Sequence, residues 1–143
     1  MDKKELAQKV VDSMMANDAF SQWLGIEILE VDAGRVVLQM TVRREMINGF
    51  NVCHGGVTFA FADSALAFAC NSHGRLSLLL KATMAYPAAV KEGDILRAEA
   101  VEESLTKKVG IYAITVTKNG GEKVGLFQGT VYRTSKEYLT LHE

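Results

Sequence analysis

The spacing of hydrophobic residues changes three times along the chain. In residues 3–15 the apolar positions recur every three or four residues, which predicts an amphipathic helix. From Gly25 onward the pattern approaches strand alternation on both sides of residues 32–34, so a β-hairpin is predicted there. Residues 55–71 contain no helix breaker and are followed by a terminating sequence at 72–74, which predicts one long central helix.

Beyond Gly74 the chain becomes rich in strand-forming residues divided by turn signals. The predicted strands are residues 76–86, 94–105, 107–118 and 122–134. This order predicts an α+β layer structure, in which the long helix packs on a curved antiparallel sheet of five or six strands and the N-terminal helix is an addition. No repeat or Pro/Gly/Ser-rich linker divides the 143 residues, so we expect one domain. Its expected parts are an N-terminal helix (1–18), a core (20–134) and a C-terminal tail (135–143).

Composition narrows the class of protein. With 48% hydrophobic and 23% charged residues, the chain is typical of a globular domain. Sixteen basic and seventeen acidic residues nearly cancel, so a nucleic-acid-binding surface is not expected. No segment resembles a signal peptide or reaches membrane-spanning length. Cys53 and Cys70 lack CxxC spacing, and we expect reduced, packed thiols in a cytoplasmic protein.

The central helix contains a carboxylate where apolar residues are expected. Asp63 lies in the middle of a segment that is hydrophobic on nearly every side, and burial of an unpaired carboxylate is costly. On a helical wheel it shares a stripe with small residues: Gly56, Ala60, Ala67 and Cys70. Such a groove admits an acyl chain or a second copy of the same helix. The alternative interpretation makes Asp63 a structural acceptor bound to Ser64 or to a loop amide.

The start of the same helix offers a second polar feature. The segment His54-Gly55-Gly56 presents backbone N–H groups that have no helical acceptors, which is typical of an anion site and of an oxyanion site in acyl transfer. Alternatively, the two glycines only allow a tight turn. Asp63 follows Gly55 by eight residues, roughly 12 Å along the helix, so one thioester carbon cannot contact both. Either one of them is not catalytic, or Gly55 of one subunit faces Asp63 of another in a dimer.

Other nucleophile and metal sites have less support. Cys53 precedes His54, but adjacent side chains in extended backbone point apart, so packing is the favoured role of Cys53. The histidine and acidic residues show no metal-binding spacing, and no metal is expected. On composition alone, Asn48-Gly49 is typical of a simple turn.

A family resemblance is carried by the segment NGFNVCHGGVTFAFADSALAFACNSHG (residues 48–74). This segment resembles the active-site loop and helix of the PaaI (phenylacetic acid degradation) family of hotdog-fold thioesterases. The resemblance covers residues 20–134, including Tyr86, a strand-turn-strand step at residues 92–94 and Gln128-Gly129-Thr130. It implies the hotdog fold and hydrolysis of an acyl-CoA to a free acid and coenzyme A, without a metal or organic cofactor. It also implies a homodimer whose helices face each other, commonly paired into a homotetramer.

The resemblance also implies roles for individual residues. Asp63 would be the nucleophile or the general base, and the Gly55 amide of the other subunit would polarise the thioester carbonyl. Asn48 would orient the water or the carbonyl, and His54 would hold the loop or lie near the sulfur.

The acyl group is expected to be hydrophobic or aromatic. Some related enzymes have a serine or threonine on the strand after the helix, at the position that Leu79 occupies here. An apolar residue there favours an apolar, phenylacetyl-like group. Gly56, Phe59 and Leu79 are therefore assigned to substrate binding, and the depth of the pocket is expected to depend on Phe59, Leu66 and Met46.

Two other functions use similar sequence features. A non-catalytic acyl-CoA-binding or regulatory module would use the same pocket, usually beside a DNA-binding segment, and none is visible here. Enoyl-CoA hydration would need an Asp and His dyad within one loop, which the spacing of His54 and Asp63 does not provide.

Overall fold

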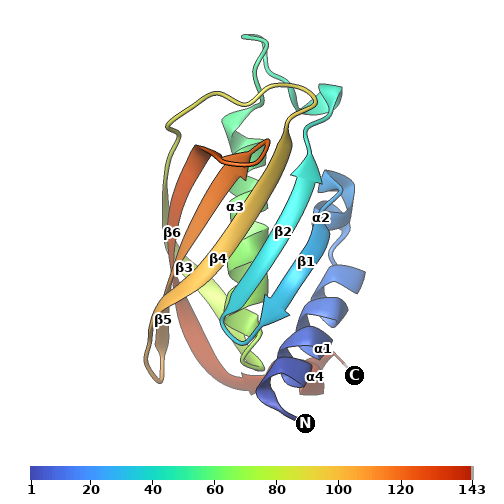
Figure 1. Cartoon of the computed structure of the whole chain (residues 1–143). Coiled ribbons are helices and arrows are strands. Elements are labelled where there is room, and N and C mark those ends of the chain that lie inside the picture. Colours follow the sequence, from blue (N-terminus) through green and yellow to red (C-terminus); the bar gives the residue numbers. More distant parts are fainter. Residues whose placement is uncertain (143) are drawn as a thin grey trace.

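The computed structural model describes residues 1–142, which form one six-stranded sheet with four α-helices (Figure 1). The helices are α1 (Lys3–Ala16), α2 (Ala19–Leu24), α3 (Gly55–Asn71) and α4 (Tyr138–Leu141). The strands are β1 (Glu27–Asp32), β2 (Arg35–Thr41), β3 (Arg75–Ala85), β4 (Ile95–Leu105), β5 (Val109–Lys118) and β6 (Glu122–Glu137). The predicted α+β class is confirmed, with six strands. Within this range, no helix is both long and apolar enough to cross a lipid bilayer.

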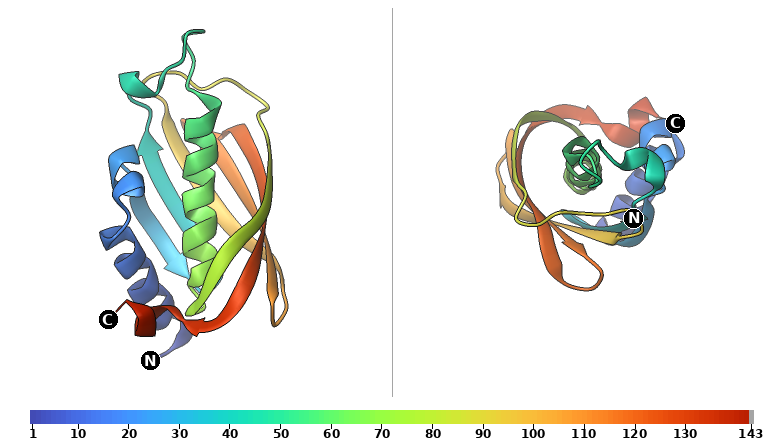
Figure 2. Two further views of the ribbon diagram at one scale, coloured as in Figure 1. Left: turned by 180° about the vertical axis from the view of Figure 1, so that it is seen from behind. Right: turned by 90° about the horizontal axis from the view of Figure 1, so that it is seen from above.

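The sheet is antiparallel throughout and has the order β1-β2-β4-β5-β6-β3. Strand β3 therefore pairs with β6 at one edge, and not with β4, the next strand along the chain. The connection over residues 86–94 crosses the end of the sheet (Figure 2). The predicted strand-turn-strand step at residues 92–94 is present, since β3 precedes the turn and β4 follows it, but these two strands are not neighbours in the sheet.

Helix α3 lies in the concave side of the sheet, which curls around it (Figure 2). Phe61, Leu66 and Phe68 are buried in the hydrophobic core that the helix shares with the strands. Gly129 of β6 allows the close approach of helix and sheet, because a Cβ atom there would lie 2.6 Å from Cδ2 of Leu66. One side of α3 is thus fixed by close packing.

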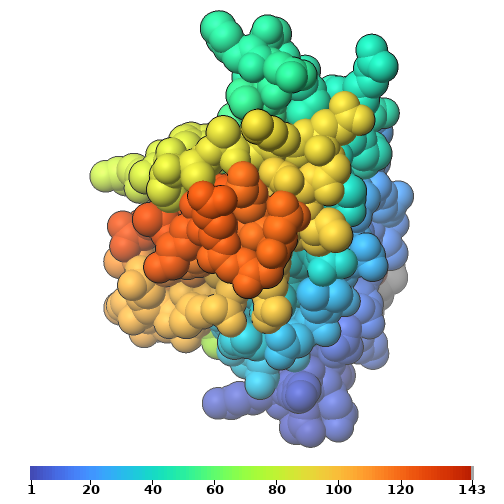
Figure 3. All heavy atoms as spheres, turned by 45° about the horizontal axis from the view of Figure 1, so that its top comes forward, coloured from blue at the N-terminus to red at the C-terminus, as the bar shows by residue number. Residues whose placement is uncertain are grey.

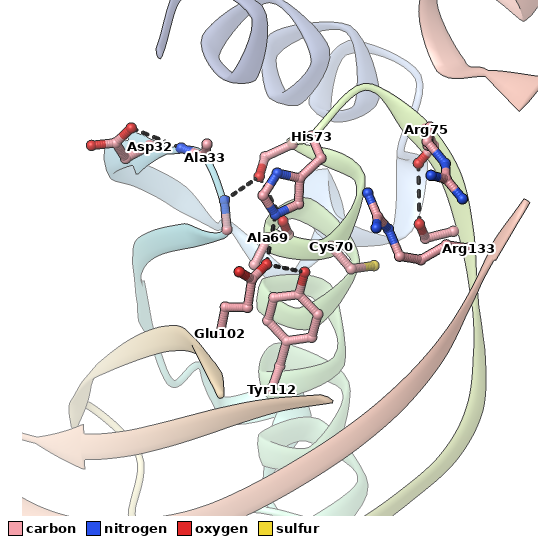
Figure 4. A network of polar contacts seen from close by, with 12 residues as sticks. Asp32, Ala33, Ala69, Cys70, His73, Arg75, Glu102, Tyr112 and Arg133 are labelled. Atoms are coloured by element: carbon pink, nitrogen blue, oxygen red, sulfur yellow. Dashed lines mark hydrogen bonds and ion pairs between the residues drawn. The ribbon is translucent and has the colours of Figure 1, made fainter. Parts of the chain in front are cut away.

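A polar network holds the C-terminal end of α3 (Figure 4). Nε2 of His73 lies 2.6 Å from Oε1 of Glu102 in β4, and the buried Tyr112 hydroxyl donates to the same oxygen at 2.8 Å. Oγ of Ser72 accepts a hydrogen bond from the N–H of Gly34 at 2.7 Å. Gly34 has φ +75°, and a Cβ atom there would lie 2.8 Å from Oε1 of Glu102, so this turn position requires glycine. These contacts tie the helix to the β1–β2 turn and to β4.

The two N-terminal helices begin at aspartate caps. Oδ1 of Asp2 accepts the N–H of Glu5 at 2.8 Å, and Oδ1 of Asp18 accepts the N–H of Ser21 at 2.9 Å. Helix α1 forms as its hydrophobic spacing predicted, and its apolar side is buried. Helix α2 ends at Gly25, which has the left-handed conformation typical of a helix C-terminus. The short α2 is placed against the middle of α3, next to the candidate site.

The C-terminal segment differs from the expected tail. Strand β6 continues to Glu137 instead of ending at residue 134, and α4 follows it. Burial of Tyr138 accounts for this difference, because its ring is 5% exposed and its N–H donates to the carbonyl of Gly74 at 2.8 Å. Residues 135–142 are therefore part of the packed structure, while Glu143 lies outside the described residues.

Candidate active site

Asp63 is a half-buried carboxylate on the uncovered side of α3. Its sequence neighbour Ser64 shares a hydrogen bond of 2.8 Å with Ser21 of α2, so this hydroxyl is already engaged elsewhere. Within residues 1–142, no hydrogen bond reaches the Asp63 carboxylate. Desolvation by burial raises the pKa of Asp63 above its usual value, and the negative charge of Asp18 adds to this shift. The interpretation of Asp63 as a structural acceptor for Ser64 is therefore wrong in this chain.

The stripe of small residues around Asp63 is open along most of its predicted length. Gly56 is exposed, and Ala60 and Ala67 are half-buried. Cys70 is the exception, because its side chain is buried and its thiol lies 3.5 Å from the carbonyl oxygen of Ala67. Burial raises the pKa of the Cys70 thiol to about 12. Cys70 therefore belongs to the core, and the open groove ends one turn earlier than the helical wheel predicted.

The first turn of α3 leaves one backbone N–H without a protein acceptor. His54 is the N-cap, and its Nδ1 accepts the N–H of Gly56 at 2.8 Å. The N–H of Val57 donates to the carbonyl of His54 at 2.9 Å. In the described part of the chain, no acceptor is bound to the N–H of Gly55. The predicted pair of free glycine amides is thus reduced to Gly55, because the imidazole of His54 occupies the amide of Gly56.

The structure of residues 1–142 does not support the alternative cysteine site. The Cys53 thiol is buried, lies 3.6 Å from the carbonyl oxygen of His54, and has a pKa raised by that burial. The ring of His54 instead binds the N–H of Gly56, so Cys53 has no adjacent base. Across residues 1–142, no group of three or more His, Cys, Asp or Glu side chains could hold a metal ion. Function without a cofactor remains a prediction.

Asn48 organises the loop that precedes α3. Its Oδ1 accepts the N–H groups of Phe50 at 2.9 Å and of Val52 at 3.4 Å. In the space-filling view this loop projects from the end of the molecule, beside the chain that follows β3 (Figure 3). The turn interpretation of Asn48 is confirmed for its side-chain oxygen. A second role for Asn48, in orienting water or a carbonyl through its amide nitrogen, stays a prediction.

The apolar residues expected to line the substrate pocket divide into partly exposed residues and buried ones. Phe59 is half-buried and packs edge-on against Phe127, with ring centroids 5.2 Å apart. Leu79 is 46% exposed on the edge strand and lies opposite buried Val131, so it faces the same side of the sheet as α3. Both remain candidates for substrate contacts. Leu66 and Met46 are 1% and 2% exposed, so they belong to the core, and their influence on the depth of the pocket stays a prediction.

Comparison with known proteins places this site in a family. A family model described as the thioesterase superfamily matches residues 50–124. The chain belongs to the thioesterase superfamily. A candidate esterase of Archaeoglobus fulgidus is 38% identical over 136 residues, which are 95% of this chain and 88% of that protein. The acyl-coenzyme A thioesterase PaaI of Escherichia coli is 38% identical over 121 residues, 85% of this chain and 86% of that protein.

The structural comparison supports the same assignment. The structure of the E. coli PaaI protein from the phenylacetic acid degradation operon matches with a TM-score of 0.93 and 34% identity, covering 95% of this chain and 99% of that chain. The predicted resemblance to the PaaI family and the predicted hotdog fold are therefore confirmed. As a member of the thioesterase superfamily, the protein is a hydrolase.

Two residues near this thioesterase site were not predicted to contribute to it. Asp18 caps α2 and lies close enough to Asp63 to raise its pKa. The hydroxyl of Tyr86 donates to the carbonyl of Gly55 at 2.9 Å. Tyr86 also borders a pocket of about 390 Å³ next to Gly55. Each contact joins distant parts of the chain, and no local spacing in the sequence identifies it.

We expect the Asp63 carboxyl to titrate above the usual aspartate value of about 3.9, because burial and Asp18 both disfavour its ionised form. Asp18→Asn removes a negative charge but keeps an oxygen acceptor for the α2 cap, so it should lower the pKa of Asp63. The measurement is a titration of carboxyl ¹³C shifts, with the Asp63 signal assigned by its absence in Asp63→Asn.

The control for this titration is Asp12→Asn, at an exposed position on α1. It should leave the Asp63 titration unchanged. An Asp63 pKa at or below the usual aspartate value would contradict the proposed desolvation.

Proposed function

We propose that this protein hydrolyses a hydrophobic or aromatic acyl-CoA, such as a phenylacetyl-like thioester, to the free acid and coenzyme A. One observation carries the proposal: the Asp63 carboxylate and the Gly55 N–H, which have no hydrogen-bond partner within residues 1–142, belong to the same partly uncovered helix. Membership of the thioesterase superfamily and the relation to E. coli acyl-coenzyme A thioesterase PaaI support acyl-CoA as the substrate class.

The two groups act together if each site is shared between two subunits. Gly55 and Asp63 are eight residues apart, which is roughly 12 Å along one helix and too far for one thioester carbon. A two-fold axis that sets two α3 helices antiparallel brings Gly55 of each subunit to Asp63 of the other and creates two equivalent sites. The open stripe of glycine and alanine beside Asp63 supports this approach of a second helix.

The edge of the sheet supports the same dimer. Within residues 1–142, β3 has β6 on one side and no strand on the other. Leu78, Leu79 and Leu80 of this edge strand are all substantially exposed. An exposed apolar edge strand is a template for pairing with another chain, and pairing of two β3 strands about the same axis would cover it. Exposed Leu126 and Tyr132 on the outer face of the sheet support further pairing into a homotetramer.

In the proposed reaction, the ionised Asp63 carboxylate attacks the thioester carbonyl or removes a proton from an attacking water. The N–H of the partner's Gly55 donates a hydrogen bond to the carbonyl oxygen as it gains negative charge. The bond between carbon and sulfur then breaks, and the sulfur leaves as a thiolate that takes up a proton. If water attacked, its oxygen is already part of the acid. If Asp63 attacked, the product is an anhydride of Asp63 and the acyl group, which water hydrolyses to release the acid and restore the carboxylate. His54 holds the loop through its contact with the N–H of Gly56, and Asn48 orients the water or the carbonyl.

The surroundings of the two groups favour an apolar acyl chain. Phe59 offers a partly open ring near the middle of α3, and Leu79 offers an aliphatic side chain on the adjacent edge strand. Neither residue provides a hydrogen-bond donor for a polar substituent. A panel of phenylacetyl, other aryl, short-chain and long-chain acyl-CoAs, followed by release of thiol, identifies the preferred group.

Asp63→Asn is expected to lower kcat at least about a hundredfold, because it removes the only carboxylate proposed to act on the carbonyl or the water. The folded-state pKa of Asp63 is raised, so its ionised form destabilises the fold once the pH exceeds that pKa. The asparagine variant should therefore have an equal or higher Tm at neutral pH and remain a dimer. Thiol release, thermal denaturation and light scattering measure these three properties.

The matched control is Asp12→Asn on exposed α1, which should retain full activity. Full activity of Asp63→Asn would refute the proposed role. Tight binding of acyl-CoA by the unmodified protein, with no thiol release from any substrate in the panel, would favour the non-catalytic binding module instead.

Gly55→Pro provides a test of the oxyanion donor. Proline removes the N–H, and it is favoured at the first position of a helix. The preceding residue, His54, already has φ −58° and ψ 130°, which proline allows in its predecessor. We expect kcat to fall about a hundredfold with little change in Tm, as for loss of one oxyanion donor.

Gly55→Ala is the control for this substitution, because it keeps the N–H. The added Cβ would lie 3.5 Å from the Tyr86 ring, an ordinary packing distance. Its kcat should stay close to that of the unmodified protein. Equal losses in the alanine and proline variants would show that the added side-chain atoms, and not the missing N–H, cause the defect.

A further inference from the structure

The peptide group between Gly55 and Gly56 is held at both of its polar ends. Its carbonyl oxygen accepts a hydrogen bond from the Tyr86 hydroxyl at 2.9 Å. Its N–H donates to Nδ1 of His54 at 2.8 Å. The two side chains come from different parts of the chain: His54 precedes α3, and Tyr86 follows β3. Because a peptide group is planar, fixing both ends fixes the orientation of the whole unit.

This restraint acts where the backbone would otherwise be most variable. Two consecutive glycines have more accessible backbone conformations than any other pair, and the first turn of a helix is prone to fraying. The Tyr86 ring also lies beside Gly55, because a Cβ atom added there would lie 3.5 Å from Cζ of the ring. Tyr86 thus limits Gly55 on one side and fixes the peptide group that follows it.

The position of Tyr86 indicates that its hydroxyl has a local role. Its side chain is 48% exposed, so it is not a core residue. It forms one wall of the pocket beside Gly55, together with Cys53, Thr58 and Val90. Partial burial raises the pKa of the Tyr86 hydroxyl, which keeps it protonated as a donor well above neutral pH.

We propose that Tyr86 is a positioning residue that aims the Gly55 N–H at the substrate carbonyl by holding the Gly55–Gly56 peptide group against His54. This inference rests on the proposed function, in which Gly55 is the oxyanion donor. A donor contributes most when it is preorganised toward the developing charge, and small misplacements reduce the rate strongly. Within residues 1–142, the Tyr86 hydroxyl bonds the carbonyl of Gly55 and makes no hydrogen bond to Asp63.

The first test compares Tyr86→Phe with Tyr132→Phe. Tyr132 is 41% exposed in β6, and within residues 1–142 its hydroxyl makes no hydrogen bond. Tyr86→Phe should lower kcat about tenfold, with KM changed less than about twofold and an unchanged Tm. Tyr132→Phe changes the proposed tetramer face and not the site, so it should leave kcat and KM unchanged. A normal kcat in Tyr86→Phe would overturn the proposal.

A second test separates this inference from the proposed function. If Tyr86 acts only through the Gly55 N–H, adding Tyr86→Phe to Gly55→Pro should cause no further loss of kcat. The same tenfold loss in both backgrounds would overturn the positioning role, while leaving the Gly55 role intact. Full activity of Gly55→Pro alone would overturn the oxyanion role and this inference with it.

Spectra of protein labelled with ¹⁵N-glycine give a readout independent of turnover. In Tyr86→Phe the amide signals of Gly55 and Gly56 should shift and exchange with solvent faster, whereas those of distant Gly120 and Gly121 should not change. Unchanged Gly55 and Gly56 signals would contradict the proposal that Tyr86 holds the Gly55–Gly56 peptide group.

Discussion

A single curled sheet cannot cover the whole circumference of a long apolar helix. Here the sheet buries the side of α3 that carries Phe61 and Phe68, and the opposite side stays only partly covered. Asp63 lies on that side, where water is reduced but no hydrogen bond reaches its carboxylate in the described residues. The small residues beside it leave room for a second helix. In the proposed dimer, the contact that covers the exposed helix also completes the site.

The start of α3 shows how a helix can offer a single, directed donor. Of the first three N–H groups, that of Gly56 is bound by the His54 ring and that of Val57 by the His54 carbonyl, which leaves Gly55. Tyr86 holds the adjacent carbonyl. The helix then acts as a rigid spacer between this donor and Asp63, because its C-terminal end is also fixed by polar contacts. Because this fixed separation is too long for one thioester carbon, the proposed site combines Gly55 of one subunit with Asp63 of the other.

Local features of the sequence predicted most of the fold and singled out the carboxylate at the centre of the candidate site. Hydrophobic period and turn residues located the long helix and six strands, and Asp63 was conspicuous because its neighbours are apolar. Contacts between distant segments were missed: Tyr86 binds Gly55 across 31 residues, and β3 pairs with β6 instead of β4. The helical wheel of α3 also placed Cys70 in the open groove, whereas its side chain is buried. The prediction failed because periodicity does not show how far the neighbouring strands extend along the helix.

The most direct test of the account is the activity of a purified heterodimer with Asp63→Asn in one subunit and Gly55→Pro in the other. In a shared arrangement, one of its two sites combines both defects, and the other has an intact Asp63 and an intact Gly55. The account predicts about half the kcat per dimer of the unmodified protein, while both homodimeric variants are nearly inactive. A heterodimer as inactive as the two homodimers would show that each site lies within one subunit and would contradict the account.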